Sequence, residues 1–550
     1  MTSTAVPQIT VLPAAQRDKT LPQLLGEHAK ENPERLFVQD ADGPRLTYGE
    51  AYDRALRWAR VLQDNGIGAG DRVATMLDNC VEGPVVWAAS SMLGAVDVSV
   101  STAYRGALLG HALNLSEARV AYVDAKALDG LSTAVADIKT LRTLIVRGPR
   151  SAETPALPFT VLWESDLIAD AEPIEPGQLP LGHEIACVVF TSGTTGPSKG
   201  ALVPWAALAN GTTTLNNALT ADDVLYLTSS ANHLIARISM LTAAQLGAAV
   251  VVKRGFRTQD FWSDIDRYGC TYSTLVGAMA HFLLSQPEAP DDASHTLRHI
   301  TISPIHPRLD DIMERFGLVN VMTSFGMTEC PSPLRTEWAP IEDIASCGHV
   351  PAGWPGWEVR LVDDKDYEVP VGEVGELIVR TQVPWTLAIG YLGMPEQTAQ
   401  AWRNGWFHTG DAFRKDSAGS FFFVDRIKDS IRRRGENVSS FEVEAEVNAH
   451  PDVAESAAIA VPSPEGEDEI KVFVVPVAEK SLDPEDLMRF LIPRMTRYMI
   501  PRYVEVVDSL PKTPTLRVKK VELRERSSGG GWDRVAAGIE LPARNREATK

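Results

Sequence analysis

The chain has 550 residues, with 53 Lys and Arg against 72 Asp and Glu, so its formal net charge is −19 at pH 7. With 44% hydrophobic and 23% charged residues, the composition is that of a globular protein and excludes a disordered chain or a small disulfide scaffold. At about 150 residues per compact unit, the length suggests three or four units. The acidic balance argues against broad binding to nucleic acid or to anionic membranes.

The cysteines and the apolar segments indicate the cellular compartment in which we expect the protein. Its five cysteines are scattered and form no CxxC pair, which suits neither a zinc site nor a disulfide framework. We therefore expect a reducing, cytoplasmic location. The N-terminal segment lacks the pattern of a signal peptide, and no uncharged apolar run reaches the roughly 18 residues of a transmembrane helix. We expect neither a membrane nor a nucleic-acid partner.

The first part of the chain, from about Leu21 to Asp124, alternates helical patterns with short apolar runs. An amphipathic helix is predicted over 48–63, introduced by Thr47, and apolar runs follow at 72–77 and 119–123. Short apolar runs between helices predict buried strands, because strands covered on both faces carry continuous hydrophobic residues.

The same alternation returns after Ile185. The strand ACVVF is followed by a loop rich in Gly and Thr, a helix, a strand at 248–253 and an apolar run at 273–284. Helices alternating with buried strands predict an α/β fold. We expect a large N-terminal domain built from two stacked α/β sheet layers.

The pattern changes in the last third of the chain. The alternating strands GWEVRLVD and GELIVRT, joined by an acidic turn, predict a small β-barrel-like subdomain at about 350–425. A new unit then follows, with a helix from Ser440, two strands and a helix opening at Asp483. We place the large domain at 1–428, a mobile α+β C-terminal domain at 429–525 and a tail at 526–550.

A polar loop directly after the strand ACVVF is the most informative local signal. Its glycines let backbone N–H groups approach an anion closely, its hydroxyls donate further hydrogen bonds, and Lys199 supplies a point charge suited to phosphate. It does not match the Walker A pattern. The loop comprises Thr191, Ser192, Gly193, Thr194, Thr195, Gly196, Pro197, Ser198, Lys199 and Gly200.

This loop, together with the segment LTYGEAYDRALRWARVLQDNGIGAGDRVATML and the motifs SFGMTE, GWFHTGD and VDRIKD, resembles the adenylate-forming superfamily. That superfamily contains acyl- and aryl-CoA synthetases, adenylation domains of nonribosomal peptide synthetases and firefly luciferase. The resemblance covers nearly the whole chain. It implies ATP and Mg²⁺ as cofactors, with CoA as the expected acceptor.

The motif SFGMTE carries three of the implied roles. In the family this motif stacks an aromatic ring on adenine, places a Thr near the α-phosphate and uses a Glu to hold Mg²⁺. Phe325, Thr328 and Glu329 inherit those roles by resemblance, and a carboxylate suits Mg²⁺, which prefers hard oxygen ligands. The whole motif is Ser324, Phe325, Gly326, Met327, Thr328 and Glu329.

Further downstream, Asp411 resembles the residue that accepts hydrogen bonds from both ribose hydroxyls, and Arg426 is its usual companion. Lys428 occupies the hinge position of the family, about which the smaller domain is expected to swing between two poses. Gly435 matches the loop that lines the pantetheine tunnel of CoA ligases. Three arginines at 432–434 precede it; such a run is typical of a solvated face, and a role on nucleotide phosphate is left open.

In the acid-binding half, His233 aligns with a family segment whose aromatic residue or His lies near the carboxylate. Arg237 follows with the spacing of the carnitine/crotonobetaine-type CoA ligase branch. The segment that begins at Trp532 also resembles that branch, and a lone hydrophobic anchor is the alternative interpretation of this tryptophan.

Two departures from the family pattern bear on the chemistry. Where the family ends its small domain with Gly-Lys, this chain has Leu516 and Arg517, so a guanidinium stands at the position of the catalytic Lys. A guanidinium is bulkier and donates as a planar fork, so the exchange is not conservative. The segment that is normally Gly-Gly-Ala-Pro is here the bulkier run 302–307, which includes His306.

These features predict an AMP-forming ligase that adenylates a small organic acid and transfers it to a nucleophile, with CoA as the first choice. An ATP-dependent diazotase, which activates nitrite for attack by an arylamine, is the alternative within the superfamily. A catalytically weakened nucleotide-binding paralogue is the third hypothesis, because loss of one preorganised cation lowers the rate severely. A homodimer is left open.

Overall fold

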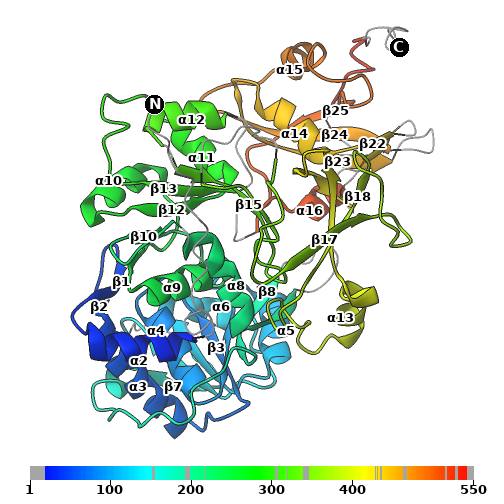
Figure 1. Cartoon of the computed structure of the whole chain (residues 1–550). Helices are drawn as coiled ribbons and strands as arrows, with labels where there is room; N and C mark the ends of the chain where they lie inside the picture. Colours follow the sequence, from blue (N-terminus) through cyan, green and yellow to red (C-terminus); the bar gives the residue numbers. More distant parts are fainter. Residues whose placement is uncertain are drawn as a thin grey trace. The chain divides into compact units, whose positions relative to one another are not determined.

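The computed structural model describes residues 19–541 except for 151–154, 192–197, 217, 304–307, 319, 339–345, 428, 430, 434–435, 463–467, 514–516, 527–530 and 540. The chain divides into two compact units (Figure 1). The first comprises Met1–Val359 and Val379–His408, and the second comprises Arg360–Ile378 and Thr409–Lys550.

The first unit contains two seven-stranded sheets. One has the strand order β7-β6-β5-β3-β4-β8-β9 and is parallel except for β9, which pairs antiparallel with β8. Its strands are β3 (Arg72–Met76), β4 (Val96–Ser99), β5 (Val120–Asp124), β6 (Thr143–Arg147), β7 (Thr160–Trp163), β8 (Ile185–Thr191) and β9 (Lys199–Pro204).

The other sheet has the order β14-β13-β12-β10-β11-β1-β2 and is parallel except for β2. Its strands are β1 (Leu36–Asp40), β2 (Arg45–Thr47), β10 (Val224–Leu227), β11 (Ala249–Val252), β12 (Tyr272–Leu275), β13 (His299–Ile302) and β14 (Asn320–Met322). The predicted α/β fold with two stacked sheet layers is confirmed.

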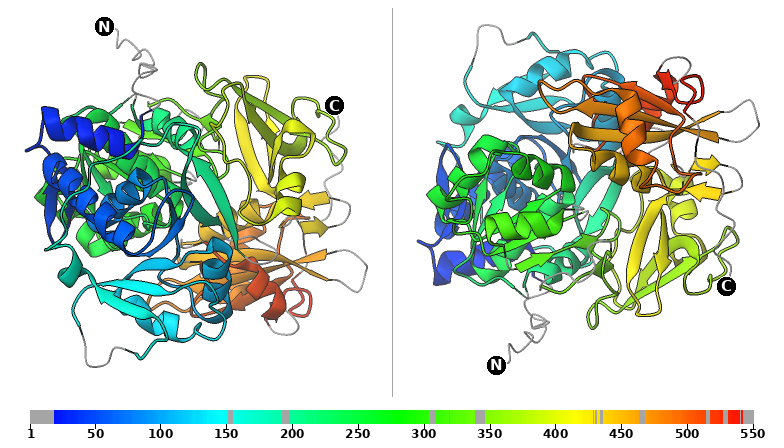
Figure 2. Two further views of the ribbon diagram at one scale, coloured as in Figure 1. Left: turned by 90° about the horizontal axis from the view of Figure 1, so that it is seen from below. Right: turned by 90° about the horizontal axis from the view of Figure 1, so that it is seen from above.

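Helices fill the space between the two sheets and cover their outer faces (Figures 1 and 2). The main core lies between the sheets and contains α2 (Leu21–Glu31), α3 (Tyr48–Asp64), α4 (Glu82–Met92), α8 (Trp205–Asn216) and α9 (Leu234–Leu246). The outer faces carry α5 (Gly106–Ser116) and α6 (Leu128–Ser132) on one side, and α10 (Thr258–Tyr268), α11 (Gly277–Leu284) and α12 (Leu309–Phe316) on the other.

Neighbouring residues of one strand face different cores, which explains the continuous apolar runs of the sequence. In β3, Val73 belongs to the core between the sheets and Ala74 to the outer core. In β11, Val250 faces the inner core and Val251 the outer one. Because successive side chains of a strand point to opposite faces, a strand covered by helices on both sides needs apolar residues throughout.

The predicted helix after Thr47 begins where the sequence places it. The Thr47 hydroxyl accepts a hydrogen bond from the Glu50 N–H at 3.2 Å, and the Glu50 carboxylate accepts one from the Thr47 N–H at 2.8 Å. This reciprocal capping box satisfies backbone donors that the first helical turn would leave unpaired.

A four-stranded sheet with the order β17-β18-β19-β20 follows, and the division between the two units runs through its strands. Its members are β17 (Trp357–Val362), β18 (Val374–Thr381), β19 (Phe407–Lys415) and β20 (Phe421–Arg426). Before it lie β15 (Ser324–Phe325) and β16 (Leu334–Arg335), and between β18 and β19 lie the short helices α13 (Pro395–Ala401) and η2 (Arg403–Gly405).

The C-terminal residues form a hairpin and a second four-stranded sheet. The hairpin is β21 (Ile431–Arg433) and β22 (Glu436–Val438), and the sheet has the order β23-β24-β25-β26. Helices α14 and α15 pack on one face of this sheet and α16 on the other. The elements are β23 (Val453–Pro462), β24 (Asp468–Pro476), β25 (Tyr503–Val506), β26 (Trp532–Asp533), α14 (Ser440–Asn448), α15 (Pro484–Leu491) and α16 (Lys520–Arg526).

Part of the segment predicted as a tail is an ordered strand. Residues Trp532–Asp533 form β26 and pair antiparallel with β25. Asp533 forms an ion pair with Arg502, with 3.2 Å between the charged atoms, and Arg534 is 5% exposed. The prediction of a tail is corrected here. Ionic and packing contacts hold this short strand, and the sequence around it has no hydrophobic periodicity that would predict a strand.

No helix within the described ranges has the length and the apolar character needed to cross a membrane.

Candidate active site

The polar loop predicted to bind phosphate starts and ends on paired strands. Thr191 is the last residue of β8 and Lys199 the first of β9, and the two lie opposite each other in the antiparallel register. The Thr191 hydroxyl donates to the Lys199 carbonyl oxygen at 3.4 Å. The intervening residues Ser192, Gly193, Thr194, Thr195, Gly196 and Pro197 lie outside the described residues.

The end of this loop is anchored by its neighbours. The Ser198 carbonyl oxygen lies 3.0 Å from His111 Nε2, so the imidazole donates a hydrogen bond there. The Ser198 hydroxyl is within 3.3 Å of the Tyr104 hydroxyl, and Ser198 is 7% exposed. The loop therefore returns to the sheet through a buried, hydrogen-bonded residue.

The motif SFGMTE leads from β15 into a tight turn. The Ser324 N–H donates to the Ser303 hydroxyl at 3.1 Å, and the Met327 N–H donates to the Cys330 carbonyl oxygen at 3.1 Å. A Cβ on Gly326 would lie 2.7 Å from the Ser332 backbone N, closer than real contacts, so only glycine fits there. Glu329 follows this turn and is 3% exposed.

Glu329 and Lys199 meet the same tyrosine. The Tyr391 hydroxyl donates to Glu329 Oε1 at 2.8 Å, and Lys199 Nζ lies 4.7 Å from the centre of the Tyr391 ring. Burial and the Glu329 carboxylate raise the pKa of Tyr391 well above its ordinary value, so the phenol stays protonated and can donate. Two residues that are 130 positions apart in sequence thus share one aromatic partner.

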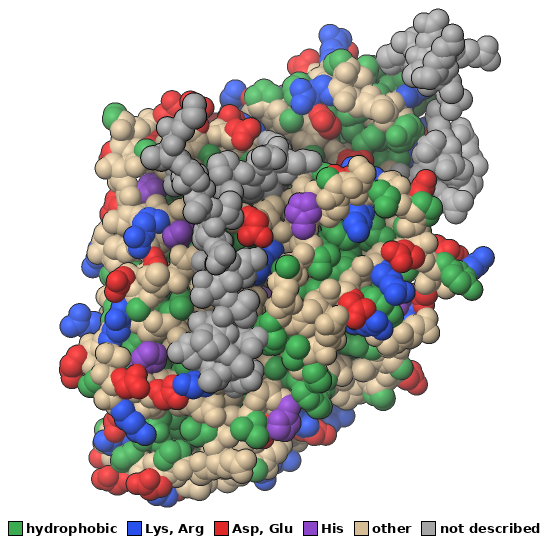
Figure 3. Space-filling model, viewed as in Figure 1, with side chains coloured by type: hydrophobic (Ala, Val, Ile, Leu, Met, Phe, Trp, Pro, Cys, Tyr) green, Lys and Arg blue, Asp and Glu red, His purple; other side chains and the backbone are tan. Residues whose placement is uncertain are grey.

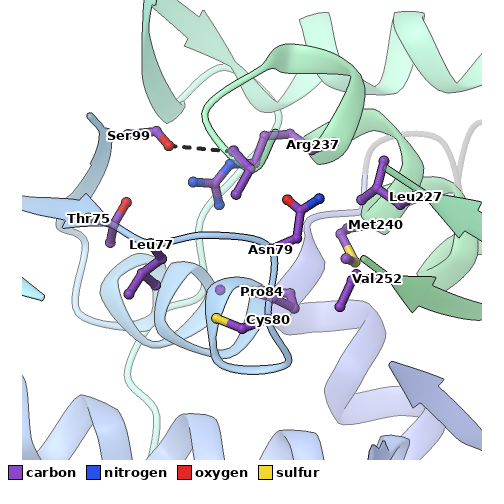
Figure 4. A pocket seen from close by; sticks show the side chains of 13 residues that line it. Thr75, Leu77, Asn79, Cys80, Pro84, Ser99, Leu227, Arg237, Met240 and Val252 are labelled. Atoms are coloured by element: carbon purple, nitrogen blue, oxygen red, sulfur yellow. Dashed lines mark hydrogen bonds between the residues drawn. The ribbon is translucent and has the colours of Figure 1, made fainter. Parts of the chain in front are cut away.

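His233 lies at the N-cap of α9, and its N–H donates to the Ser230 carbonyl oxygen at 2.9 Å. One turn further along the helix, Arg237 is 6% exposed and lies beside a cavity between the two sheets (Figure 4). The cavity measures about 30 Å³, room for about two waters. It is lined by Thr75, Leu77, Asn79, Cys80, Gly83, Pro84, Ser99, Leu227, Ala231, Ala236, Arg237, Met240 and Val252.

The charge of Arg237 is compensated inside the protein. Arg237 Nη2 lies 2.5 Å from Asp97 Oδ2, and the Thr75 hydroxyl donates to Asp97 Oδ1 at 2.9 Å. The guanidinium also lies 4.8 Å from the centre of the Trp87 ring. Burial raises the pKa of Asp97, while Arg237 and Thr75 pull it down. Arg237 is therefore paired with a carboxylate of the protein and is not available to bind a substrate carboxylate.

In the second unit, Asp411 and Arg426 face each other on β19 and β20. They are register partners, and Arg426 Nε lies 3.3 Å from Asp411 Oδ1. Asp411 is 3% exposed, and its N–H donates to the Thr409 hydroxyl at 3.1 Å. The predicted pair is thus present, with one oxygen of the carboxylate held by an arginine.

Hydrogen bonds join the segments before and after position 428, and two ion pairs lie within the segment that follows it. The Ser440 N–H donates to Asp425 Oδ2 at 2.6 Å, and Lys520 lies 2.8 Å from the Glu444 carboxylate. Asp429 forms an ion pair with Arg524 at 2.6 Å. The predicted hinge and tunnel residues themselves, Lys428 and Gly435, lie outside the described residues.

Arg433 contradicts the solvated face expected of the arginine run. It is 1% exposed and donates to the backbone carbonyl oxygens of Tyr498 at 3.0 Å and Ile500 at 2.7 Å. Its guanidinium also pairs with Glu469 at 2.6 Å. Arg433 therefore fastens the hairpin β21–β22 to the C-terminal sheet, which leaves it no surface for nucleotide phosphate.

Arg517 is exposed and is hydrogen-bonded to Thr513. The Thr513 N–H donates to the Arg517 carbonyl oxygen at 2.7 Å, and the Arg517 N–H donates to the Thr513 hydroxyl at 3.1 Å. Its neighbour Leu516 lies outside the described residues.

Comparison with known proteins identifies the family. The protein-family model described as AMP-binding enzyme matches residues 25–392 of the chain. The family model described as AMP-binding enzyme C-terminal domain matches residues 442–516. The chain belongs to the AMP-binding enzyme family. It is an AMP-forming ligase of the adenylate-forming superfamily, as the motifs predicted.

Curated relatives of this AMP-binding enzyme include CoA ligases of one branch. The crotonobetaine/carnitine–CoA ligase of Proteus mirabilis is 29% identical over 517 residues, which cover 89% of this chain and 95% of that protein. The enzyme of the same name from Escherichia coli is 28% identical over 498 residues, covering 87% and 93%. The predicted resemblance to this branch is confirmed.

Solved structures match over nearly the full length. The anthranilate CoA ligase AuaEII in complex with anthranoyl-AMP has a TM-score of 0.84 and 22% identity, covering 97% of this chain and all of that chain. ATP-bound MatB from Rhodopseudomonas palustris has a TM-score of 0.78 and 25% identity, covering 92% and 98%. The first likeness shows the fold alone.

Tyr391 is the residue of this AMP-binding enzyme that sequence reasoning missed. It stands in the run AIGYLG, whose composition is that of an ordinary buried segment. The only available signal was a tyrosine followed by a glycine-containing turn, which is too common to predict a role. Its contacts with Glu329 and Lys199 come from chain segments that lie far apart in sequence.

Proposed function

We propose that this enzyme uses ATP to adenylate a small organic acid and then transfers the acyl group to CoA. In the first step a carboxylate oxygen attacks the α-phosphorus and pyrophosphate leaves. In the second the CoA thiol attacks the acyl carbon, loses its proton to solvent, and AMP leaves. The observation that carries the proposal is the close grouping of Lys199 and Glu329 around Tyr391, on loops that the family uses for the nucleotide phosphates.

The residues of the first unit would act mainly by positioning and by neutralising charge. Lys199 carries a point charge suited to phosphate, and no carboxylate within the described ranges forms an ion pair with it. Thr328, next to Glu329, would place its hydroxyl near the α-phosphate. Phe325 would stack on adenine, with Ser324, Gly326 and Met327 shaping the turn that carries it. His233 would lie near the acid carboxylate.

Glu329 fits a divalent cation by its donor chemistry. Its carboxylate is buried, offers hard oxygen atoms and is oriented by a hydrogen bond from a neutral phenol. Mg²⁺ bound there together with the nucleotide phosphates would neutralise charge on the pyrophosphate that leaves. The protein's part is to hold the carboxylate in one orientation and to keep Lys199 beside it.

In the second unit, Asp411 would accept hydrogen bonds from both ribose hydroxyls. Its pairing with Arg426 fixes the orientation of the carboxylate, which is what an acceptor of two hydroxyl donors needs. Lys428 would be the hinge between the two steps, Gly435 would line the path of the CoA arm, and Arg517 would supply the cation next to the reacting carboxylate and α-phosphate.

Arg517 also supports a second candidate function within the superfamily. A planar guanidinium can donate two parallel hydrogen bonds to a small planar anion, as nitrite is. An ATP-dependent diazotase would activate nitrite as a nitrosyl adenylate, and an arylamine would then displace AMP. An aminoaryl acid fits both candidates, because its carboxylate suits the first and its amine the second.

Pyrophosphate release with purified enzyme separates these functions. We expect release with at least one small aliphatic or aryl acid, and formation of the matching CoA thioester when CoA is added. Release with nitrite plus an aminoaryl acid, and with no carboxylic acid alone, would replace the ligase proposal by the diazotase. ATP binding without release in any mixture would instead favour a nucleotide-binding paralogue.

A further inference from the structure

Tyr391 lies on a segment that extends the edge of the first sheet. The Leu202 N–H donates to the Gly390 carbonyl oxygen at 2.9 Å, the Leu392 N–H donates to the Gly200 carbonyl oxygen at 2.8 Å, and Tyr391 forms an antiparallel bridge with Ala201. The backbone of Tyr391 is therefore fixed directly beside β9, the strand that begins with Lys199.

The same segment holds Glu329 at two points. The Ala388 N–H donates to the Glu329 backbone carbonyl oxygen at 2.9 Å, and the Tyr391 hydroxyl donates to Glu329 Oε1 at 2.8 Å. Both the backbone and the side chain of Glu329 are thus tied to residues 388–391. A hydrogen bond to a buried carboxylate is strong, because without the donor the charged carboxylate would stay buried with no hydrogen-bond partner.

The ring of Tyr391 suits Lys199 better than a carboxylate would. An ammonium over an aromatic face is attracted without losing its charge, whereas an ion pair would cancel the charge that a phosphate ligand needs. The ring is itself held, because the Tyr391 N–H donates to the Thr398 hydroxyl at 2.9 Å and Trp402 packs edge-on against it. Tyr391 is 8% exposed, so water does not compete strongly for either contact.

We propose that Tyr391 is a positioning residue for adenylation, whose hydroxyl orients Glu329 toward the divalent cation while its ring holds Lys199 toward the nucleotide phosphates. The inference rests on the proposed use of ATP, and it adds a residue that acts through two others. Because it concerns nucleotide and cation binding, it can be tested without knowledge of the acid.

The test compares three variants by the Mg²⁺ dependence of α,β-methylene-ATP binding, measured calorimetrically with no acid present. Tyr391→Phe keeps the ring and loses the hydroxyl, so we expect the Mg²⁺ concentration for half-maximal binding to rise by about 10- to 100-fold. Tyr391→Leu also loses the ring, so we expect binding of the analogue to weaken by a further two- to fivefold or so.

Tyr226→Phe is the matched control. Tyr226 is 3% exposed and donates to the Asp264 carboxylate at 2.6 Å, so this variant also loses a buried tyrosine–carboxylate hydrogen bond within the same unit. We expect it to keep the Mg²⁺ dependence of the natural chain. The proposal is overturned if Tyr391→Phe also keeps that dependence, if both Phe variants shift alike, or if the natural chain binds the analogue without regard to Mg²⁺. Failure of every acid to release pyrophosphate would overturn the proposed function and leave this result standing.

Discussion

Arg517 is proposed to lie next to the reacting groups, and its substitution tests whether the charge or the shape of the side chain matters there. Removing one preorganised cation from such a site typically costs about 10²- to 10³-fold in rate, so we predict that loss for Arg517→Ala in pyrophosphate formation. Arg517→Lys keeps the charge in a smaller group and should equal or exceed the natural chain.

The control for Arg517 is Lys519→Ala, which removes a neighbouring cation whose partner is the surface residue Glu522. It should leave pyrophosphate formation unchanged. If Arg517→Lys loses as much activity as Arg517→Ala, the planar fork of the guanidinium has a task of its own, and the diazotase hypothesis gains support.

The buried pair of Asp97 and Arg237 should matter for stability. Removing one partner leaves an uncompensated charge between the sheets, so Asp97→Ala is predicted to lower the free energy of unfolding by about 3–5 kcal/mol. The double variant with Asp97→Ala and Arg237→Met should recover most of this loss. Denaturant unfolding provides the measurement.

Arg489→Ala is the surface control for that prediction. Its pair with Glu485 is largely exposed, at 70% and 43% of the two side chains, and such pairs contribute about 0–1 kcal/mol. A double variant as unstable as Asp97→Ala alone would mean that Arg237 stabilises the fold through its contact with Trp87 rather than through charge.

At these residues the sequence predicted chemistry but not partners. Lys199 was predicted from the polar loop that follows a buried strand, whereas Glu329 and Asp411 were predicted from the resemblance of their motifs to the family. With one exception, the side chains that contact these residues were not predicted. A hydrogen bond such as that between Tyr391 and Glu329 joins segments 62 residues apart, and no local pattern indicates it. The exception is Arg426, which lies on the strand that pairs directly with that of Asp411.

The helices and strands were predicted mainly from the periodicity of apolar residues in the sequence. The runs at 72–77 and 119–123 became β3 and β5, the helix at 48–63 became α3, and the strands at 356–380 became β17 and β18. Each has either a continuous buried run or an amphipathic pattern. The strand β26 was missed, because two residues are too short to show any period.

The attachment of β26 should depend on pH. Burial raises the pKa of Asp533, but hydrogen bonds from Arg502 and from the N–H groups of Val535 and Ala536 outweigh it and hold that pKa below its ordinary value near 3.8. A depressed carboxyl pKa gives stability that is fully present above the ordinary value and is lost as the pH falls through the lower, folded value.

Hydrogen exchange measures this effect directly. We predict that the amides of residues 531–539 keep their protection at neutral pH and lose it below about pH 3.8, before the central strands do. In Arg502→Gln the protection should already be weaker at neutral pH and should fall less as the pH drops, since the carboxyl loses its main hydrogen-bond donor and its folded pKa is no longer lowered as far. Unchanged protection in that variant would show that packing of Trp532, and not the ion pair, attaches the strand.

The whole molecule has a net charge of −19, whose effect depends on how the charges are distributed. On the face drawn in Figure 3, acidic and basic side chains are interspersed rather than gathered by sign. Charges of mixed sign favour solubility more than the binding of a polyanion. The cations with a proposed role are single residues placed by local contacts, which agrees with a small anionic ligand such as ATP.

The contacts across position 428 should set the balance between the two steps of the reaction. Asp425 precedes the proposed hinge and accepts from the Ser440 N–H, which follows it, and both lie in the second unit. We expect a swing of the C-terminal residues about position 428 to break this hydrogen bond. A hydrogen bond to a carboxylate contributes about 1.5–3 kcal/mol, enough to shift a two-pose equilibrium by roughly tenfold or more.

We therefore predict that Asp425→Asn, which keeps the size of the side chain and removes its charge, changes the two steps in opposite directions. One of adenylation and thioester formation should become faster relative to the natural chain and the other slower, because weakening one pose populates the other. Single-turnover kinetics of each step provide the measurement, with Asp452→Asn, which weakens the surface pair with Lys480, as the control. Equal slowing of both steps would show that Asp425 supports the neighbouring Arg426 instead of the pose.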